Sequence, residues 1–139
     1  MNNLFSVNVK YLKPKEGTDG FKRVNETYLV NAVSFTDAEA KTVAEMELRS
    51  IYEFQVDSIK REKYSYVLTN DKDGGMWFNA SIESNTTEEG ETPKKLRMSL
   101  CIESSHIDKV SEIISDLLGD SLTYELIKVS VSNIFYVIQ

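Results

Sequence analysis

Basic and aromatic side chains interleave at residues 60–66 (KREKYSY) of this 139-residue chain. This segment is the best candidate for binding chemistry. Further lysines occur near the amino terminus. Cations beside aromatic rings on strands suit single-stranded nucleic acid, because the cations bind phosphates while the rings stack on bases. The residues that could bind nucleic acid or another partner in this way are Lys10, Lys13, Lys60, Arg61, Lys63 and Tyr64.

The same segment also has a simpler structural explanation. Tyr64, Tyr66 and Leu68 alternate as the core residues of a strand do, and a charged turn between two strands is common. We therefore interpret the segment as a solvated turn followed by core aromatics. Nucleic-acid binding stays the alternative.

Patterns of catalytic or metal-binding residues are weak. His106 is the single histidine and Cys101 the single cysteine, so no zinc site is expected. Residues 71–74, Asp-Lys-Asp-Gly, have the form of the start of a calcium loop, but its closing glutamate is missing. No glycine-rich phosphate loop occurs. The sequence therefore predicts a protein that is not an enzyme and binds no cofactor or metal.

Composition and charge narrow the class further. The chain is 41% apolar and 27% charged, which are globular values, and it has no apolar run of membrane-spanning length. One cysteine and no signal peptide favour a reducing cytoplasm. Residues 1–69 have 10 basic and 10 acidic side chains, whereas residues 70–139 have 6 and 12 and carry the whole net charge of −6. Such a protein gains no long-range attraction to phosphate.

An internal duplication organises the chain. Residues 22–69 and 92–139 share one apolar rhythm, seventy residues apart, which indicates two copies of one structural unit. Apolar residues at every second position predict strands, and apolar residues three or four positions apart predict a helix. The expected strands are about 5–11, 22–34, 52–60 and 63–69, then 77–82, 96–102, 122–130 and 133–138, with a hairpin loop at 14–20 and helices at about 37–50 and between Ser105 and Gly119.

Both helix starts carry capping signals. Thr36 and Glu39 have the spacing of a capping box, and Ser105 is the expected cap of the second helix. Gly119 is expected to end the second helix in a left-handed conformation. The side chains expected to face inward from the first helix are Ala40, Val43, Ala44 and Leu48.

The predicted fold class is α+β. Two tandem ββαββ repeats, about 1–70 and 76–139, would make one pseudo-two-fold domain of residues 1–139. One helix cannot cover both faces of its sheet, so the halves should pack together or share an antiparallel sheet. Long edge strands such as 133–138 would also allow pairing into a homodimer.

Two segments, residues 28–40 (YLVNAVSFTDAEA) and 54–61 (FQVDSIKR), resemble the DUF4494 family, an uncharacterised group of gut Bacteroidetes and their phages and prophages. The resemblance covers nearly the whole chain. It implies a protein of phage or mobile-element origin in the cytoplasm of a bacterial host cell, with no established activity and no assigned site residues. We therefore expect a non-enzymatic accessory protein that binds a protein partner, such as a host factor. The alternative is a single-stranded nucleic-acid-binding module of phage replication.

Overall fold

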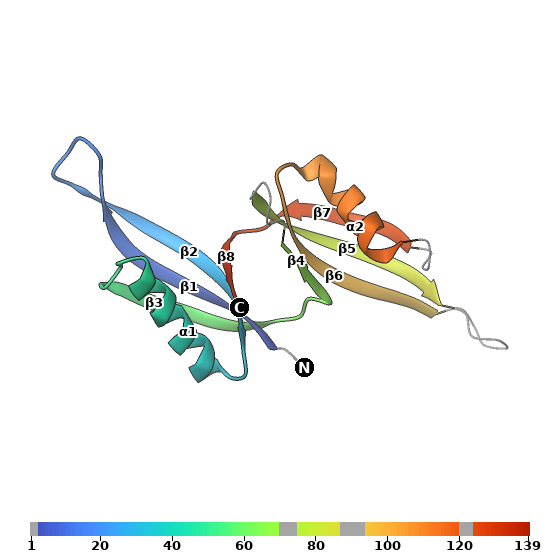
Figure 1. Cartoon of the computed structure of the whole chain (residues 1–139), viewed down its shortest axis with the longest axis horizontal. Coiled ribbons are helices and arrows are strands. Elements are labelled where there is room, and N and C mark those ends of the chain that lie inside the picture. Colours follow the sequence, from blue (N-terminus) through green and yellow to red (C-terminus); the bar gives the residue numbers. More distant parts are fainter. Residues whose placement is uncertain (1–2, 70–74, 87–93, 120–123) are drawn as a thin grey trace. The chain divides into compact units, whose positions relative to one another are not determined.

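The computed structural model describes residues 3–69, 75–86, 94–119 and 124–139, and within these ranges the predicted ββαββ order occurs twice (Figure 1). The fold class, α+β, is confirmed. The elements are β1 (Asn3–Pro14), β2 (Phe21–Ala32), α1 (Phe35–Leu48), β3 (Phe54–Glu62), β4 (Tyr66–Leu68), β5 (Met76–Thr86), β6 (Lys94–Ser104), a 3₁₀ turn (Ile107–Lys109), α2 (Val110–Leu118), β7 (Tyr124–Val131) and β8 (Ile134–Ile138).

The strands form two four-stranded sheets. Sheet A has the order β3-β1-β2-β8 and sheet B has the order β4-β6-β5-β7. The chain divides accordingly into unit 1, residues 1–63 with 133–139, and unit 2, residues 64–132. The prediction that both repeats make up one domain stays a prediction.

Each repeat gives its fourth strand to the sheet of the other repeat. β4 follows β3 along the chain but pairs with β6, and β8 follows β7 but pairs with β2. Both of these pairs are parallel and the other pairs are antiparallel. The sheets are therefore mixed, which corrects the antiparallel arrangement expected from the sequence. A strand pairs antiparallel with the strand before it when the chain reverses between the two. After β3 and β7 the chain instead leads through residues 63–65 and 132–133 into the other sheet.

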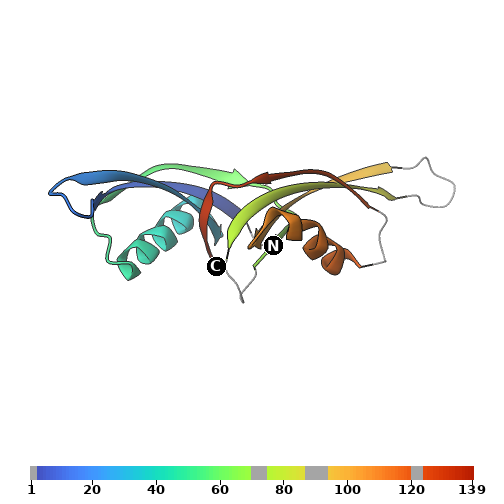
Figure 2. The same cartoon turned by 90° about the horizontal axis from the view of Figure 1, so that it is seen from above.

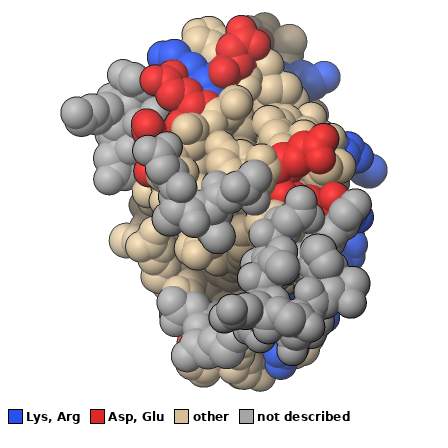
Figure 3. Space-filling view, turned by 90° about the vertical axis from the view of Figure 1, so that its right-hand side faces the viewer, with Lys and Arg blue, Asp and Glu red and all other residues tan. Residues whose placement is uncertain are grey.

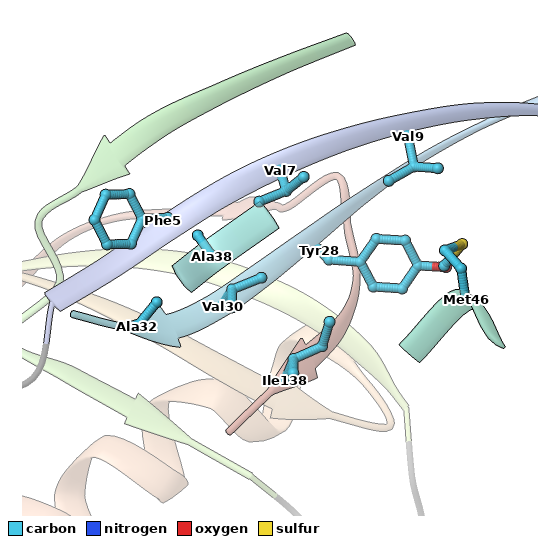
Figure 4. Close-up of a cluster of buried hydrophobic side chains, with 9 residues drawn as sticks. All are labelled: Phe5, Val7, Val9, Tyr28, Val30, Ala32, Ala38, Met46 and Ile138. Atoms are coloured by element: carbon cyan, nitrogen blue, oxygen red, sulfur yellow. The ribbon is translucent and has the colours of Figure 1, made fainter. Parts of the chain in front are cut away.

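The core of unit 1 lies between sheet A and α1 (Figure 2). Alternate residues of β1 and β2 point to this side, because successive side chains of a strand face opposite ways. Ile138 brings β8 into the same core (Figure 4). Its buried members are Phe5, Val7, Val9, Tyr28, Val30, Ala32, Ala38, Met46 and Ile138.

Helix α1 begins with a capping box two residues earlier than predicted. The Ser34 hydroxyl accepts a hydrogen bond from the backbone N–H of Asp37 at 3.1 Å. The Asp37 carboxylate accepts one from the N–H of Val33 at 3.0 Å. Ser34 and Asp37 thus take the capping roles that were expected of Thr36 and Glu39.

The predicted inward face of α1 is wrong. The buried residues are Ala38, Thr42 and Met46, whereas Leu48 is 81% exposed. Thr42 can be buried because its hydroxyl donates to the backbone oxygen of Ala38 at 2.8 Å. Thr42 is therefore part of the buried face of α1, which lies at a different angle around the helix from the predicted face.

The core of unit 2 lies between sheet B and α2. The cap predicted at Ser105 is wrong, because the 3₁₀ turn begins after His106 and α2 begins after Lys109, and neither start has a side-chain cap hydrogen bond. Gly119 ends α2, as expected, with a positive φ of 60°, but its ψ of −155° lies outside the left-handed helical conformation that was predicted. The buried members are Phe78, Ala80, Ile82, Leu100, Ile102, Val110, Ile114 and Leu118.

Candidate functional site: the β1–β2 ribbon

The hairpin of β1 and β2 extends beyond its neighbours in sheet A (Figure 1). The two strands pair with each other as far as Pro14 and Phe21. The pairing with β3 stops at Tyr11, and the pairing with β8 starts only at Thr27. Residues 12–23 therefore form a two-stranded ribbon, which we call the β1–β2 ribbon. Its turn falls within the predicted loop.

One face of the ribbon exposes apolar side chains. Leu12 lies opposite Arg23, and Pro14 lies opposite Phe21, so these four residues share a face. Leu12 is 60% exposed and Phe21 is 62% exposed. Exposure of such side chains leaves a potential stabilisation of about 1.5–3 kcal/mol each unused. A partner that covers both residues would use it.

The other face opposes two like charges. Lys13 lies directly opposite Lys22, and both are exposed. Like charges in directly opposed positions destabilise a strand pair. With Lys15 and Arg23, the ribbon has four basic residues against two acidic ones, Glu16 and Asp19. An anionic partner surface would relieve this repulsion.

The charge of the rest of the chain differs from that of the ribbon. Unit 1 has 10 basic and 10 acidic residues, while unit 2 has 6 and 12 and accounts for the net charge of −6. Figure 3 looks from the right-hand side of Figure 1 and shows acidic side chains among uncharged surface, with most visible Lys and Arg side chains along one edge. The ribbon is thus a local cationic feature of an acidic protein.

The six predicted binding residues lie on β1, on β3 and in the segment that directly follows β3. Lys10 and Lys13 lie on β1, and Lys10 forms an exposed ion pair with Asp57 at 3.3 Å. Lys60 is exposed on β3, and Lys63 is exposed just after that strand.

Arg61 and Tyr64 also have local partners. The guanidinium carbon of Arg61 lies 5.4 Å from the ring centre of Phe5 and the same distance from that of Phe35. Tyr64 belongs to unit 2, where its hydroxyl bonds with the Asn79 side chain at 2.9 Å. Tyr64 thus has a partner within unit 2 and directly follows Lys63 in the chain.

Four ribbon residues were missed in the sequence: Leu12, Phe21, Lys22 and Arg23. The predicted loop at 14–20 would set Lys13 opposite Phe21, one residue out of the observed register, in which Lys13 lies opposite Lys22. Hairpin register, rather than the density of basic residues along the chain, identifies this surface.

A buried carboxylate lies at one end of the unit 1 core. Glu26 accepts hydrogen bonds from the hydroxyls of Tyr11 and Tyr28, the latter at 3.2 Å. These bonds replace the water that the carboxylate loses on burial. Arg49 donates to the Tyr28 hydroxyl at 3.2 Å.

Arg49 also fastens strand β8 to unit 1. Its guanidinium carbon lies 5.1 Å from the ring centre of Phe135 and 4.8 Å from that of Tyr136, both on β8. Its Nε is bonded to Glu45 of α1 at 3.1 Å. Each ring contact contributes about 0.5–1 kcal/mol. The cluster therefore has a structural role, which is to hold the exchanged strand.

The tyrosines of this cluster predict a loss of stability at alkaline pH. Burial, followed by the hydrogen bond to Glu26, raises the pKa of Tyr11 from 10.0 to about 12. Burial also raises the pKa of Tyr28. The unfolded chain therefore releases these protons at lower pH than the folded chain does. The contribution of these tyrosines to the free energy of unfolding is present below about pH 10. It is lost as the pH rises through their pKa values in the folded chain.

Tyr11→Phe is expected to reduce this alkaline loss. Urea unfolding at about pH 8 and about pH 11 measures the drop in the free energy of unfolding, which should be smaller in the variant. The variant should itself be less stable at about pH 8 by about 1–3 kcal/mol, because Glu26 loses a donor. Tyr52→Phe, at an exposed tyrosine, is the control and should keep the wild-type drop. An unchanged drop in Tyr11→Phe would contradict this linkage.

His106 and Cys101, the two residues considered for zinc binding, both lie in unit 2. Within the described ranges, no group of three or more His, Cys, Asp or Glu residues could hold a metal ion, and no helix is long and apolar enough to cross a membrane. His106 is exposed and Cys101 is buried. The calcium-loop pattern at 71–74 lies outside the described residues.

Comparison with known proteins gives one match. A family model described as a domain of unknown function (DUF4494) matches residues 3–139, and this confirms the resemblance seen in the sequence. No curated protein matches the chain, and no solved structure does.

Proposed function

We propose a function on one premise: the chain belongs to the DUF4494 family, a domain of unknown function, so its own surface must indicate its role. The protein is a non-enzymatic binding protein. Its β1–β2 ribbon holds a protein partner that has an apolar depression beside acidic side chains.

The exposure of Leu12 and Phe21 on one face of a projecting ribbon carries this proposal. Interfaces take most of their binding energy from a few buried apolar or aromatic anchors, with charges at the rim. Arg23 shares the face of the anchors and would meet acidic rim residues, and acidic side chains that reach around the ribbon to Lys13 and Lys22 would relieve the repulsion between these two lysines.

Single-stranded nucleic acid is the second candidate, and the four basic residues of the ribbon favour it. Two observations count against it. The acidic unit 2 supplies no attraction for phosphate, and Tyr64 is engaged with Asn79 in unit 2. Nucleic-acid binding would weaken steeply with salt, whereas binding to apolar anchors would not.

The biological setting expected from the resemblance is part of the same proposal. The partner would be a host factor in the cytoplasm of a bacterial cell, and the protein would belong to a phage or mobile element. The neighbouring genes test this setting, since phage replication or counter-defence genes would support it and ordinary metabolic genes would oppose it.

The double variant L12S/F21S is expected to lose the partner. Each anchor contributes about 1.5–3 kcal/mol when it is buried, so affinity should fall at least about tenfold. The measurement is an affinity pull-down from host lysate with and without nuclease, followed by titration of the retained protein. V33S/L48S is the matched control, because Val33 and Leu48 are apolar residues of unit 1 that are 80% and 81% exposed but lie outside the ribbon.

Three outcomes separate the candidates. Loss of a nuclease-resistant partner in L12S/F21S but not in V33S/L48S supports protein binding through the ribbon. Capture that disappears with nuclease or high salt, and with K13E/K22E, supports nucleic acid instead. Equal capture by wild type and by every variant contradicts both.

A further inference from the structure

The outer edge of β7 is the least protected strand edge in the described part of the chain. β3 is also an edge strand, but it carries charged side chains at Asp57, Lys60, Arg61 and Glu62. β4 has only 3 residues, and β8 is an edge of 5 residues with Arg49 over two of its rings. β7 has 8 residues and only two charged side chains, Glu125 and Lys128. Proteins usually block such edges, because unpaired backbone groups invite another strand.

A bulge in β7 places its two charges on the same face of sheet B. Glu125 lies opposite Glu83, and Lys128 lies opposite Ser81, with a register shift between these positions. Without the extra residue, side chains three positions apart would point to opposite faces. The shift therefore creates an acidic and a basic side chain side by side along one exposed edge.

Glu125 lacks a cation of its own in this sheet. It faces the like charge of Glu83, whose carboxylate is already bound by Arg97 at 2.7 Å. Among the described residues, neither Glu125 nor Lys128 forms an ion pair. A cation supplied from outside the edge would offset the repulsion between Glu83 and Glu125.

A second copy of the strand supplies that cation. Two antiparallel copies of β7 are related by a two-fold axis perpendicular to the sheet, which keeps every side chain on its own face. In the register that sets Glu125 opposite Lys128 of the second copy, Lys128 also meets the Glu125 of that copy. The same register sets Tyr124 opposite Val129, and both of these residues lie on the α2-covered side, opposite Ser84 and Ala80. In each of these opposed pairs, the two side chains therefore point to the same face of the sheet.

We propose that this protein forms a symmetric dimer in which β7 pairs antiparallel with β7 of a second copy, Glu125 opposite Lys128. Sheet B then continues across the axis into the second chain. Ile127, which is 44% exposed in the single chain, lies at the centre of this pairing. This contact is independent of the β1–β2 ribbon, which belongs to the other sheet.

Charge exchange tests both the dimer and its register. Light scattering and sedimentation of the full chain over a range of concentrations should show a species of twice 15.8 kDa. K128E alone, or E125K alone, places like charges opposite each other at two symmetric positions and should weaken self-association at least about tenfold. The double variant E125K/K128E restores opposite charges in the same register and should regain the dimer.

Matched controls and a second measurement complete the test. K109E and E112K make the same charge changes at exposed positions outside β7 and should leave the dimer unchanged. Trp77 fluorescence confirms that each variant is folded, and amide exchange of residues 124–131 should slow as the wild-type concentration rises. A monomer at every concentration, a dimer that K128E does not weaken, or no recovery in the double variant would overturn the proposal.

Discussion

Replacing Gly75 with Ala is expected to destabilise unit 2 by about 3 kcal/mol or more. Gly75 has a φ of +148°, and a Cβ at this position would lie 2.3 Å from the backbone oxygen of Ser104 and 2.5 Å from its carbonyl carbon. The clash is with backbone, which cannot move without breaking the pairing of Met76 with Ser104 at the start of β5. Backbone strain and overpacking each cost on the order of 1–3 kcal/mol.

Denaturant unfolding followed by Trp77 fluorescence measures this loss. Trp77 is the single tryptophan, is buried, and lies two residues after Gly75. Gly17→Ala is the matched control, because Gly17 also has a positive φ of +77° but its added Cβ would meet nothing within 4 Å. Because Gly17 lies in unit 1, circular dichroism follows the unfolding of that variant, which should lose only about 1 kcal/mol, from backbone strain alone. Wild-type stability in Gly75→Ala would contradict the close approach of the two strands.

Removing residues 133–139 is expected to unfold unit 1 while unit 2 stays folded. The truncation takes Ile138 out of the core, which costs about 2 kcal/mol, and removes the backbone hydrogen bonds to β2 at about 1 kcal/mol each. It also removes both rings of β8 that contact Arg49. Since a unit of this size is stable by only about 4–10 kcal/mol, most of that stability would be lost.

Two probes separate the units in this experiment. Circular dichroism reports both sheets, whereas Trp77 fluorescence reports sheet B, so the first signal should fall and the second should persist. Removal of Gln139 alone, an exposed residue after β8, is the control and should have little effect. An unchanged dichroism signal would contradict the role of β8. Loss of both signals together would instead show that the two sheets unfold as one cooperative domain.

The residues of the candidate site were only partly predictable. Lys13 was identified by its type and its place in the first hairpin, but Leu12 and Phe21 were not, because exposed apolar residues in a strand pattern look like core residues. Their exposure depends on how far β3 and β8 extend beside the hairpin. That extent is set by tertiary pairing, and a local pattern cannot reveal it.

Helix α1 shows the same limit at a smaller scale. Its position was predicted closely, since Ser, Thr and Asp near residues 34–37 mark a start. Its buried face was wrong, because Thr42 enters the core by bonding to its own helix while Leu48 lies beyond the edge of the sheet contact. Apolar spacing alone cannot include such a polar core residue.

The duplicated ββαββ order and the α+β class could be predicted from the sequence alone. The spacing of apolar residues that distinguishes a strand from a helix is visible within each short segment of the chain. The exchange of β4 and β8 could not be read in this way. Alternation records which face of a strand is buried but not which strand lies beside it. Neighbours are chosen by the contacts that a whole sheet offers, such as the rings of β8 against Arg49 and Ile138 within the unit 1 core.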